Sequence, residues 1–160
     1  MKYFKILIGI FIALAASRFI PHPPNFTSLL ALSFYVPALL GKKYIPALVF
    51  SFILTDFFIG FHSVTLFTWG SVILIGLASK FFLQNIIIRI CGALFGAIIF
   101  YIISNFGVWL VGHYSHESIS LISIYILALP FFAYSLISTI IFSSLIETVF
   151  YFYKKKFINT

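Results

Sequence analysis

The chain has 160 residues, of which 62% are hydrophobic and only 8% are charged. Soluble domains carry about 25% charged residues, so this composition excludes an ordinary soluble domain and favours a membrane protein. The formal net charge of +7 does not indicate nucleic-acid binding, because the basic residues are scattered in ones, twos and threes between apolar runs.

The apolar runs predict an all-α, polytopic membrane bundle, a single domain over residues 1–160 with about six crossings of about 20 residues each. The helices are expected over about residues 4–20, 25–40, 44–61, 64–83, 86–112 and 119–153. The first run superficially resembles a secretory signal, but it continues into a proline-rich turn and an even number of crossings needs it. We therefore expect it to be retained as a helix.

Proline and glycine mark several helix ends. The prolines within residues 21–24 are expected to stop the first helix. Asn25 or Thr27 is expected to cap the second helix, which Gly41 ends. Pro130 predicts a kink or break in the last run, and a seventh short element there is an open alternative.

The distribution of lysine and arginine predicts the orientation, because cytoplasmic loops of membrane proteins carry an excess of both. With both termini in the cytoplasm, only Arg18 lies at the outer side. The nine other basic residues lie inside: Lys2, Lys5, Lys42, Lys43, Lys80, Arg89, Lys154, Lys155 and Lys156. This pattern predicts a membrane protein with both termini in the cytoplasm and with anionic cytoplasmic lipid as a partner of the basic residues.

Asp56 is the most informative residue, because a carboxylate inside a membrane helix costs several kcal/mol unless it is paired or wetted. It is expected to face the bundle interior or a cavity. It is either part of a ligand or proton site or a structural partner of Arg18, which lies at a similar depth. Arg18 can bind a carboxylate or phosphate, or it can extend from its helix end to the lipid headgroups.

Other polar residues join this candidate site at the outer face. His22 and Asn25 lie in the first outer loop, a stiff wall over a pocket or, for Asn25, a helix cap. Asn105 and Trp109 are four residues apart and share a helix face, where an amide could hydrogen-bond and an indole could stack on a ligand. The alternative for Trp109 is the interfacial aromatic belt, which we also expect for Trp69.

Three further features are assigned structural roles. His113 and His116 lie in a polar loop, and no histidine pair has a metalloprotease spacing. Glu147 is expected to extend toward the lysines near the C-terminus. Small residues four apart predict close helix packing or a partner-binding face. They are Gly9, Ala13 and Ser17 in the first helix and Gly92 and Gly96 in the fifth.

No hydrolase elbow, phosphate loop, dinucleotide fingerprint or zinc motif occurs in the chain. We therefore expect no enzymatic activity, no catalytic residues, no cofactor and no bound metal.

The helix count, the orientation and the small-residue first helix resemble the substrate-binding S component of energy-coupling-factor (ECF) vitamin transporters. More specifically, Ser17-Arg18, residues 21–27, Asp56 and the pair Asn105 and Trp109 resemble a bacterial family of unknown function described only as candidate transport proteins. The resemblance covers nearly the whole chain. It implies an S-component-like fold with a ligand near the outer face, under the loop between the first two helices.

By this resemblance the substrate-binding positions are Arg18, His22, Asn25, Asp56, Asn105 and Trp109. S components that dock to a transmembrane coupling subunit with ATPases often carry alanines four apart on the first helix; this chain has a small-residue variant of that pattern. Nickel and cobalt S components carry histidine after the initiator methionine, where this chain has Lys2. The resemblance therefore does not imply metal uptake.

Three functions remain open from the sequence. The first is a membrane-embedded binding protein for uptake of a small, vitamin-like polar molecule, energised by partner ATPases. The second is a standalone secondary carrier in which Asp56 binds a coupling proton. The third is a non-transporting assembly or scaffold subunit whose small-residue faces bind partner helices.

Overall fold

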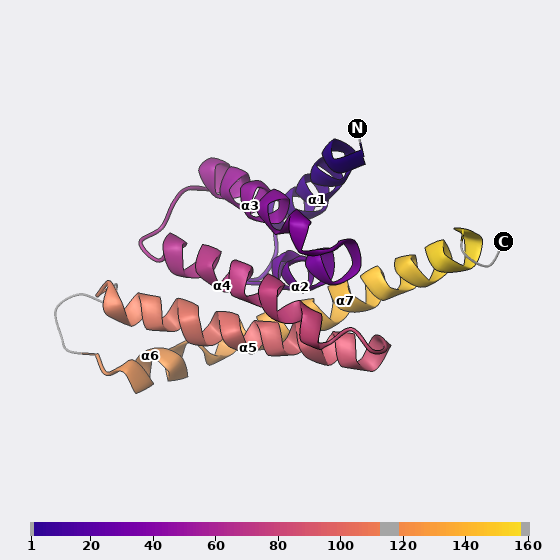
Figure 1. Cartoon of the computed structure of the whole chain (residues 1–160). Helices are drawn as coiled ribbons and strands as arrows, with labels where there is room; N and C mark the ends of the chain where they lie inside the picture. Colours follow the sequence, from indigo (N-terminus) through magenta and orange to yellow (C-terminus); the bar gives the residue numbers. More distant parts are fainter. Residues whose placement is uncertain (1, 113–118, 158–160) are drawn as a thin grey trace.

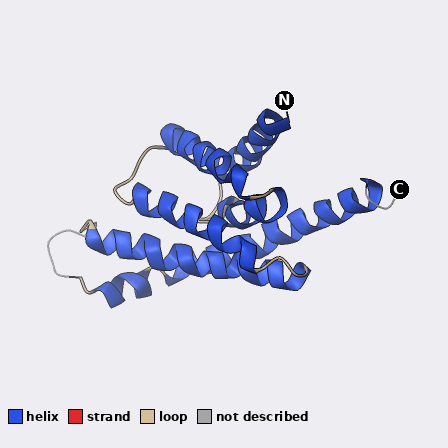
Figure 2. Cartoon of the chain, in the orientation of Figure 1, coloured by secondary structure: helices blue, strands red, loops and turns tan. Residues whose placement is uncertain are grey.

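The computed structural model describes residues 2–112 and 119–157, and within these ranges every regular element is a helix (Figure 2). The prediction of an all-α fold is therefore confirmed. The α-helices are α1 (Lys2–Phe19), α2 (Leu29–Leu40), α3 (Ile45–Ile59), α4 (Thr65–Ala78), α5 (Ile86–Leu110), α6 (Leu121–Leu127) and α7 (Leu129–Phe157). Two 3-10 turns, η1 (Lys42–Tyr44) and η2 (Ser79–Phe81), precede α3 and follow α4.

Helix α2 lies at the centre of the bundle, where it contacts α3, α4, α5 and α7 (Figure 1). Helix α1 packs on α3, and α5 packs between α4 and α7. In Figure 1 the start of α1 and the end of α7 lie at the right, whereas the connection from α3 to α4 and the start of α6 lie at the left. Helices α1 to α5 therefore run back and forth between two ends of the bundle, and α6 and α7 together make the last run.

One expected helix boundary is wrong and one predicted break is confirmed, each for a local reason. Helix α2 begins at Leu29 rather than near residue 25, because Asn25 adopts a left-handed conformation with φ of 63° that interrupts a helix. The last run is broken at Ala128 into α6 and α7, which confirms the predicted break near Pro130. Pro130 is the second residue of α7, where its missing amide donor costs no helical hydrogen bond.

The surface and the interior are both largely apolar, and the interior also contains small hydroxyl residues. Small hydroxyl residues are buried, and several donate to a carbonyl one turn earlier in their own helix, as Ser33 does to Leu29 O (2.6 Å) and Ser51 to Ala47 O (2.9 Å). Large apolar side chains cover the outside. Those at least 67% exposed come from five helices: Phe57, Leu66, Ile87, Ile122 and Val149. An apolar exterior of this kind is typical of proteins in contact with lipid.

Among the described residues, two helices are long and apolar enough to cross a membrane, over Ile86–Leu110 and Leu129–Lys155. Shorter apolar helices span Leu29–Leu40 and Thr65–Phe81.

The small residues of α5 are used for packing inside the bundle. A Cβ atom on Gly92 would come within 2.6 Å of Phe34 Cε2 and of Phe82 Cβ, and one on Gly96 within 2.8 Å of Ile75 Cγ2. These glycines therefore allow α5 to approach its neighbours closely. A Cβ atom on Gly9 of α1 would meet nothing within 4 Å, so Gly9 is not used for packing inside the bundle.

Candidate functional site

The turn between α1 and α2 is held by a pair of serines. Ser17 Oγ lies 2.7 Å from Ser28 Oγ and accepts a hydrogen bond from Ser28 N (3.1 Å). Thr27 Oγ1 accepts from Leu29 N at 3.3 Å. The expected capping by Asn25 is wrong, because Asn25 lies before the turn that starts α2. The serine pair brings the end of α1, with Arg18, against the start of α2.

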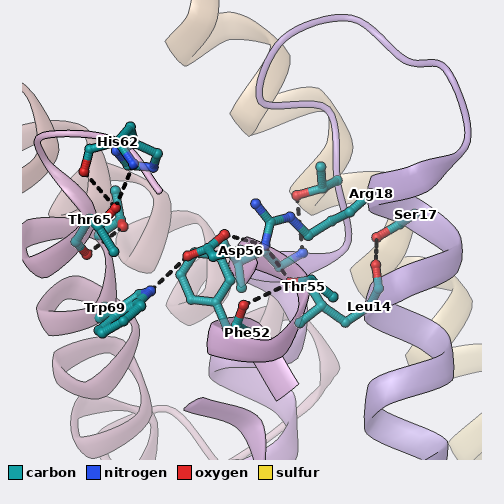
Figure 3. A network of polar contacts seen from close by, with 12 residues as sticks. Leu14, Ser17, Arg18, Phe52, Thr55, Asp56, His62, Thr65 and Trp69 are labelled. Atoms are coloured by element: carbon teal, nitrogen blue, oxygen red, sulfur yellow. Dashed lines mark hydrogen bonds and ion pairs between the residues drawn. The ribbon is translucent and has the colours of Figure 1, made fainter. Parts of the chain in front are cut away.

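Arg18 and Asp56 form an ion pair between α1 and α3 (Figure 3). Arg18 Nη1 lies 2.6 Å from Asp56 Oδ1 and donates to Thr55 Oγ1 at 2.5 Å. The Asp56 side chain is 1% exposed, whereas that of Arg18 is 14% exposed. Of the two readings for Asp56 and Arg18, the pairing of the two residues is confirmed. The carboxylate is the deeper partner, and the guanidinium separates it from the exterior.

Two aromatic residues complete this ion pair. Trp69 Nε1, from α4, donates to Asp56 Oδ2 at 2.7 Å, on the other side of the carboxylate from Arg18 in Figure 3. The Arg18 guanidinium carbon lies 4.7 Å from the centre of the Phe52 ring, within the range of a cation–π contact. Trp69, which was expected in an aromatic belt, instead links α4 to the buried acid of α3.

A cavity of about 410 Å³ lies beside Arg18. Its polar wall includes Arg18, His22, Asn25, His62, Ser104 and Asn105. Its aromatic wall consists of Phe52, Phe100, Tyr101, Phe131 and Phe132. A cavity of this size, mostly apolar with a few polar groups that converge on it, is typical of a small-molecule site.

Of the residues predicted for the site, four line the cavity: Arg18, His22, Asn25 and Asn105. His22 Nδ1 lies 2.7 Å from Pro23 O. Because a carbonyl only accepts, Nδ1 of His22 is the donor in this contact. Asn105 Nδ2 donates to Tyr101 O at 2.8 Å, so its amide oxygen and one N–H remain for a ligand.

The structure places the other predicted residues away from the lining. Asp56 is buried behind Arg18 and reaches the cavity only through it. Trp109 is 42% exposed, packs on Phe106 and does not line the cavity. The loop histidines His113 and His116 lie outside the described residues.

Sequence reasoning missed several residues that matter here. His62 and Ser104 line the cavity, and Thr55 and Trp69 bind the ion pair. Thr55 is adjacent to Asp56 in the chain, and this proximity could have been used to predict it as a site residue. Trp69 carried no such signal, because its contact depends on how closely α3 and α4 pack.

We expect Trp69→Phe to lower the free energy of unfolding by about 1–3 kcal/mol, because Asp56 Oδ2 would lose its buried indole donor. Thermal unfolding of the purified protein in mild detergent measures this loss. Trp109→Phe is the matched control, since Trp109 is largely exposed, and its effect should stay within about 0.5 kcal/mol. Equal effects of the two substitutions would contradict a role for the Trp69–Asp56 bond.

A second ion pair lies at the N-terminal end of α5, away from the cavity. Arg89 Nε and Nη2 donate to Glu147 Oε1 and Oε2 at 2.6 and 2.7 Å. The expectation that Glu147 extends toward the C-terminal lysines is therefore wrong: it is 5% exposed and bridges α7 to α5. The buried hydroxyls of Tyr35 and Ser143 belong to the same cluster.

Within the part of the chain that the structure describes, no three His, Cys, Asp or Glu side chains gather as metal ligands. Over the described residues 2–112 and 119–157, the protein is all-helical, with two helices able to cross a membrane and a mostly apolar cavity with a few polar groups near one end of the bundle.

The chain belongs to DUF6580, a family of unknown function whose model matches residues 1–160. No curated protein and no solved structure matches the chain.

Proposed function

We propose that the protein is a membrane-embedded substrate-binding protein for uptake of a small, vitamin-like polar molecule. It crosses a bacterial inner membrane six times with both termini in the cytoplasm, and its cavity opens outward. The observation that carries the proposal is the cavity of about 410 Å³ with the held guanidinium of Arg18 in its wall. Binding energy for a small ligand comes from such a set of fixed polar groups inside apolar walls.

The position of the cavity supports the orientation. Its polar residues come from the end of α1, the loops that lead into α2 and α4, and the second half of α5. Lys42, Lys43 and Lys80 lie at the opposite ends of these helices, in η1 and η2. If the lysine-rich end faces the cytoplasm, the cavity faces outward.

Six crossings require the shorter helices to span the membrane as well. Helix α2 has 12 residues, or about 18 Å of helical rise, which is less than a hydrocarbon core of about 30 Å. Its backbone ends need not meet lipid, because α2 is enclosed by α3, α4, α5 and α7. The exposed apolar side chains of α3, α4 and α6 support contact of these helices with lipid.

The other two functions have less support. As a proton site, Asp56 would have to break its contacts with Arg18 and Trp69, and it does not line the cavity. As a scaffold, α5 would need a free small-residue face, but Gly92 and Gly96 are packed against Phe34, Phe82 and Ile75. Gly9 on α1 has open space around it, which suits a coupling subunit of the ECF type.

Affinity purification from native membranes in mild detergent, with mass spectrometry of the co-purifying proteins, tests this function. A second membrane subunit with paired ATPases would support an energy-coupled binding protein. Gly9→Leu should then abolish the co-purification without changing the melting temperature, whereas Leu66→Ala on the exposed face of α4 should not. A well-folded chain that purifies alone and takes up substrate without ATP would replace this proposal with the secondary carrier.

A further inference from the structure

We propose that the ligand of this cavity carries an oxyanion, a carboxylate or a phosphate, bound by the Nε and Nη2 edge of Arg18. This inference rests on the proposed function, because it assigns the chemical class of the molecule that the same cavity takes up. Two features carry it: the hydrogen-bond donors that Arg18 has left, and the charges of the residues around the cavity.

The contacts of Arg18 occupy one of its terminal nitrogens. Nη1 lies 2.5 Å from Thr55 Oγ1 and 2.6 Å from Asp56 Oδ1. Nε and Nη2 make no hydrogen bond to the residues that the structure describes. These two nitrogens are a planar pair of donors whose spacing matches the two oxygens of a carboxylate or phosphate. Arg18 lines the cavity, so a ligand there can reach it.

The charges around the cavity favour a negative ligand. Of the acidic residues in the described ranges, Asp56 is buried behind Arg18 and Glu147 is paired with Arg89 at the other end of α5. Neither lines the cavity. A cationic ligand would thus find no described carboxylate in the wall, and the guanidinium of Arg18 would repel it. An anion finds the guanidinium of Arg18.

Asp56 acts in this site as a positioning residue. Its carboxylate lowers the net positive charge near Arg18. Binding of the ligand therefore depends more on directed hydrogen bonds from Arg18 than on long-range electrostatic attraction. Because Asp56 and Thr55 hold Nη1 from the α3 side, the remaining donors are fixed before the ligand arrives. A neutral carbonyl could accept only one of these bonds well, whereas an oxyanion accepts both.

The aromatic wall indicates the rest of the ligand. Tyr101 and Phe132 stack with ring centres 4.4 Å apart, and Phe52 lies under the guanidinium. These rings offer an apolar surface beside the donors of Arg18. The ligand is therefore a small molecule with an oxyanion at one end and a flat or apolar body, within a cavity of about 410 Å³.

The test uses the full chain in phosphatidylcholine nanodiscs, with thermal unfolding and direct titration of matched probes. The probes are nicotinate against nicotinamide, pantothenate against panthenol, and inorganic phosphate. We expect an acid to raise the melting temperature where its neutral partner does not. Arg18→Lys should weaken that binding about tenfold to hundredfold, because lysine keeps the charge beside Asp56 and loses the planar fork. Lys80→Met, at the opposite end of the bundle, should leave the affinity unchanged.

A lipid headgroup could supply the same oxyanion, so a second arm adds phosphatidylglycerol to the nanodiscs and measures retained lipid by native mass spectrometry. Retention that Arg18→Lys abolishes would support the oxyanion site and assign it to lipid, and the uptake function would then fail. The inference is overturned if neutral probes bind as tightly as acids, if Arg18→Lys binds acids like the wild type, or if neither phosphate, acid nor phosphatidylglycerol binds. In those cases the proposed uptake function is still tested separately by the co-purification experiment.

Discussion

Arg89→Met is expected to lower the free energy of unfolding by about 3–5 kcal/mol, because it leaves the buried carboxylate of Glu147 without its partner. The pair is bidentate, with Nε–Oε1 and Nη2–Oε2 distances of 2.6 and 2.7 Å. It joins α5 to α7, the two helices with the length and apolarity to cross a membrane. Denaturation with SDS from a mild-detergent state measures the loss.

The double variant Arg89→Met with Glu147→Leu should recover most of that stability, since apolar residues of similar volume often replace a buried ion pair without loss. Val149→Ala is the control on α7: its side chain is 70% exposed, and the effect should stay below about 1 kcal/mol. If Arg89→Met unfolds like the wild type, the bridge between α5 and α7 does not contribute to stability.

The helical framework could be predicted from the sequence because its signals are local. Long apolar runs, Gly41 and the proline-rich turn place most helix ends within a few residues, and Pro130 predicted the break before α7. The start of α2 was misplaced because the left-handed conformation of Asn25 is set by the turn as a whole. The short length of α2 likewise could not be read from a continuous apolar run.

The candidate site could be predicted in part, because charged residues are rare in this chain and each needs a partner. That argument anticipated the pair of Arg18 and Asp56, which the structure confirms. The same argument could have predicted the pair of Arg89 and Glu147. Glu147 was instead assigned to the lysines near the C-terminus, because they are closer to it in the sequence.

Which side chains line a cavity depends on how far it extends along a helix, and spacing alone does not give that extent. Asn105 and Trp109 are four residues apart on α5, yet Asn105 lines the cavity and Trp109 lies beyond it. The role of Trp69 depends on the distance between α3 and α4, which the sequence does not specify. Predictions from periodicity therefore identified the helix face but not where along it the cavity ends.

The outer ion pair is expected to show strong coupling in a double-mutant cycle. Arg18→Met should cost about 3–5 kcal/mol, because Asp56, at 1% exposure, would keep only the indole donor of Trp69. Asp56→Asn should cost less, about 1–3 kcal/mol, since an amide oxygen can still accept from Trp69 and Arg18 is the more exposed partner. SDS titration of both single variants and of the double variant measures the cycle.

The double variant Arg18→Met with Asp56→Asn should be more stable than the sum of the single losses predicts, by about 0.5–3 kcal/mol. Purely additive losses would contradict a direct interaction between the two side chains. The same variant also separates stability from recognition, because it removes the charges and the donor edge of Arg18 together while limiting the folding defect. If it stays folded and no longer binds acidic probes, the pair of Arg18 and Asp56 is required for binding, and the loss cannot be assigned to unfolding of the protein.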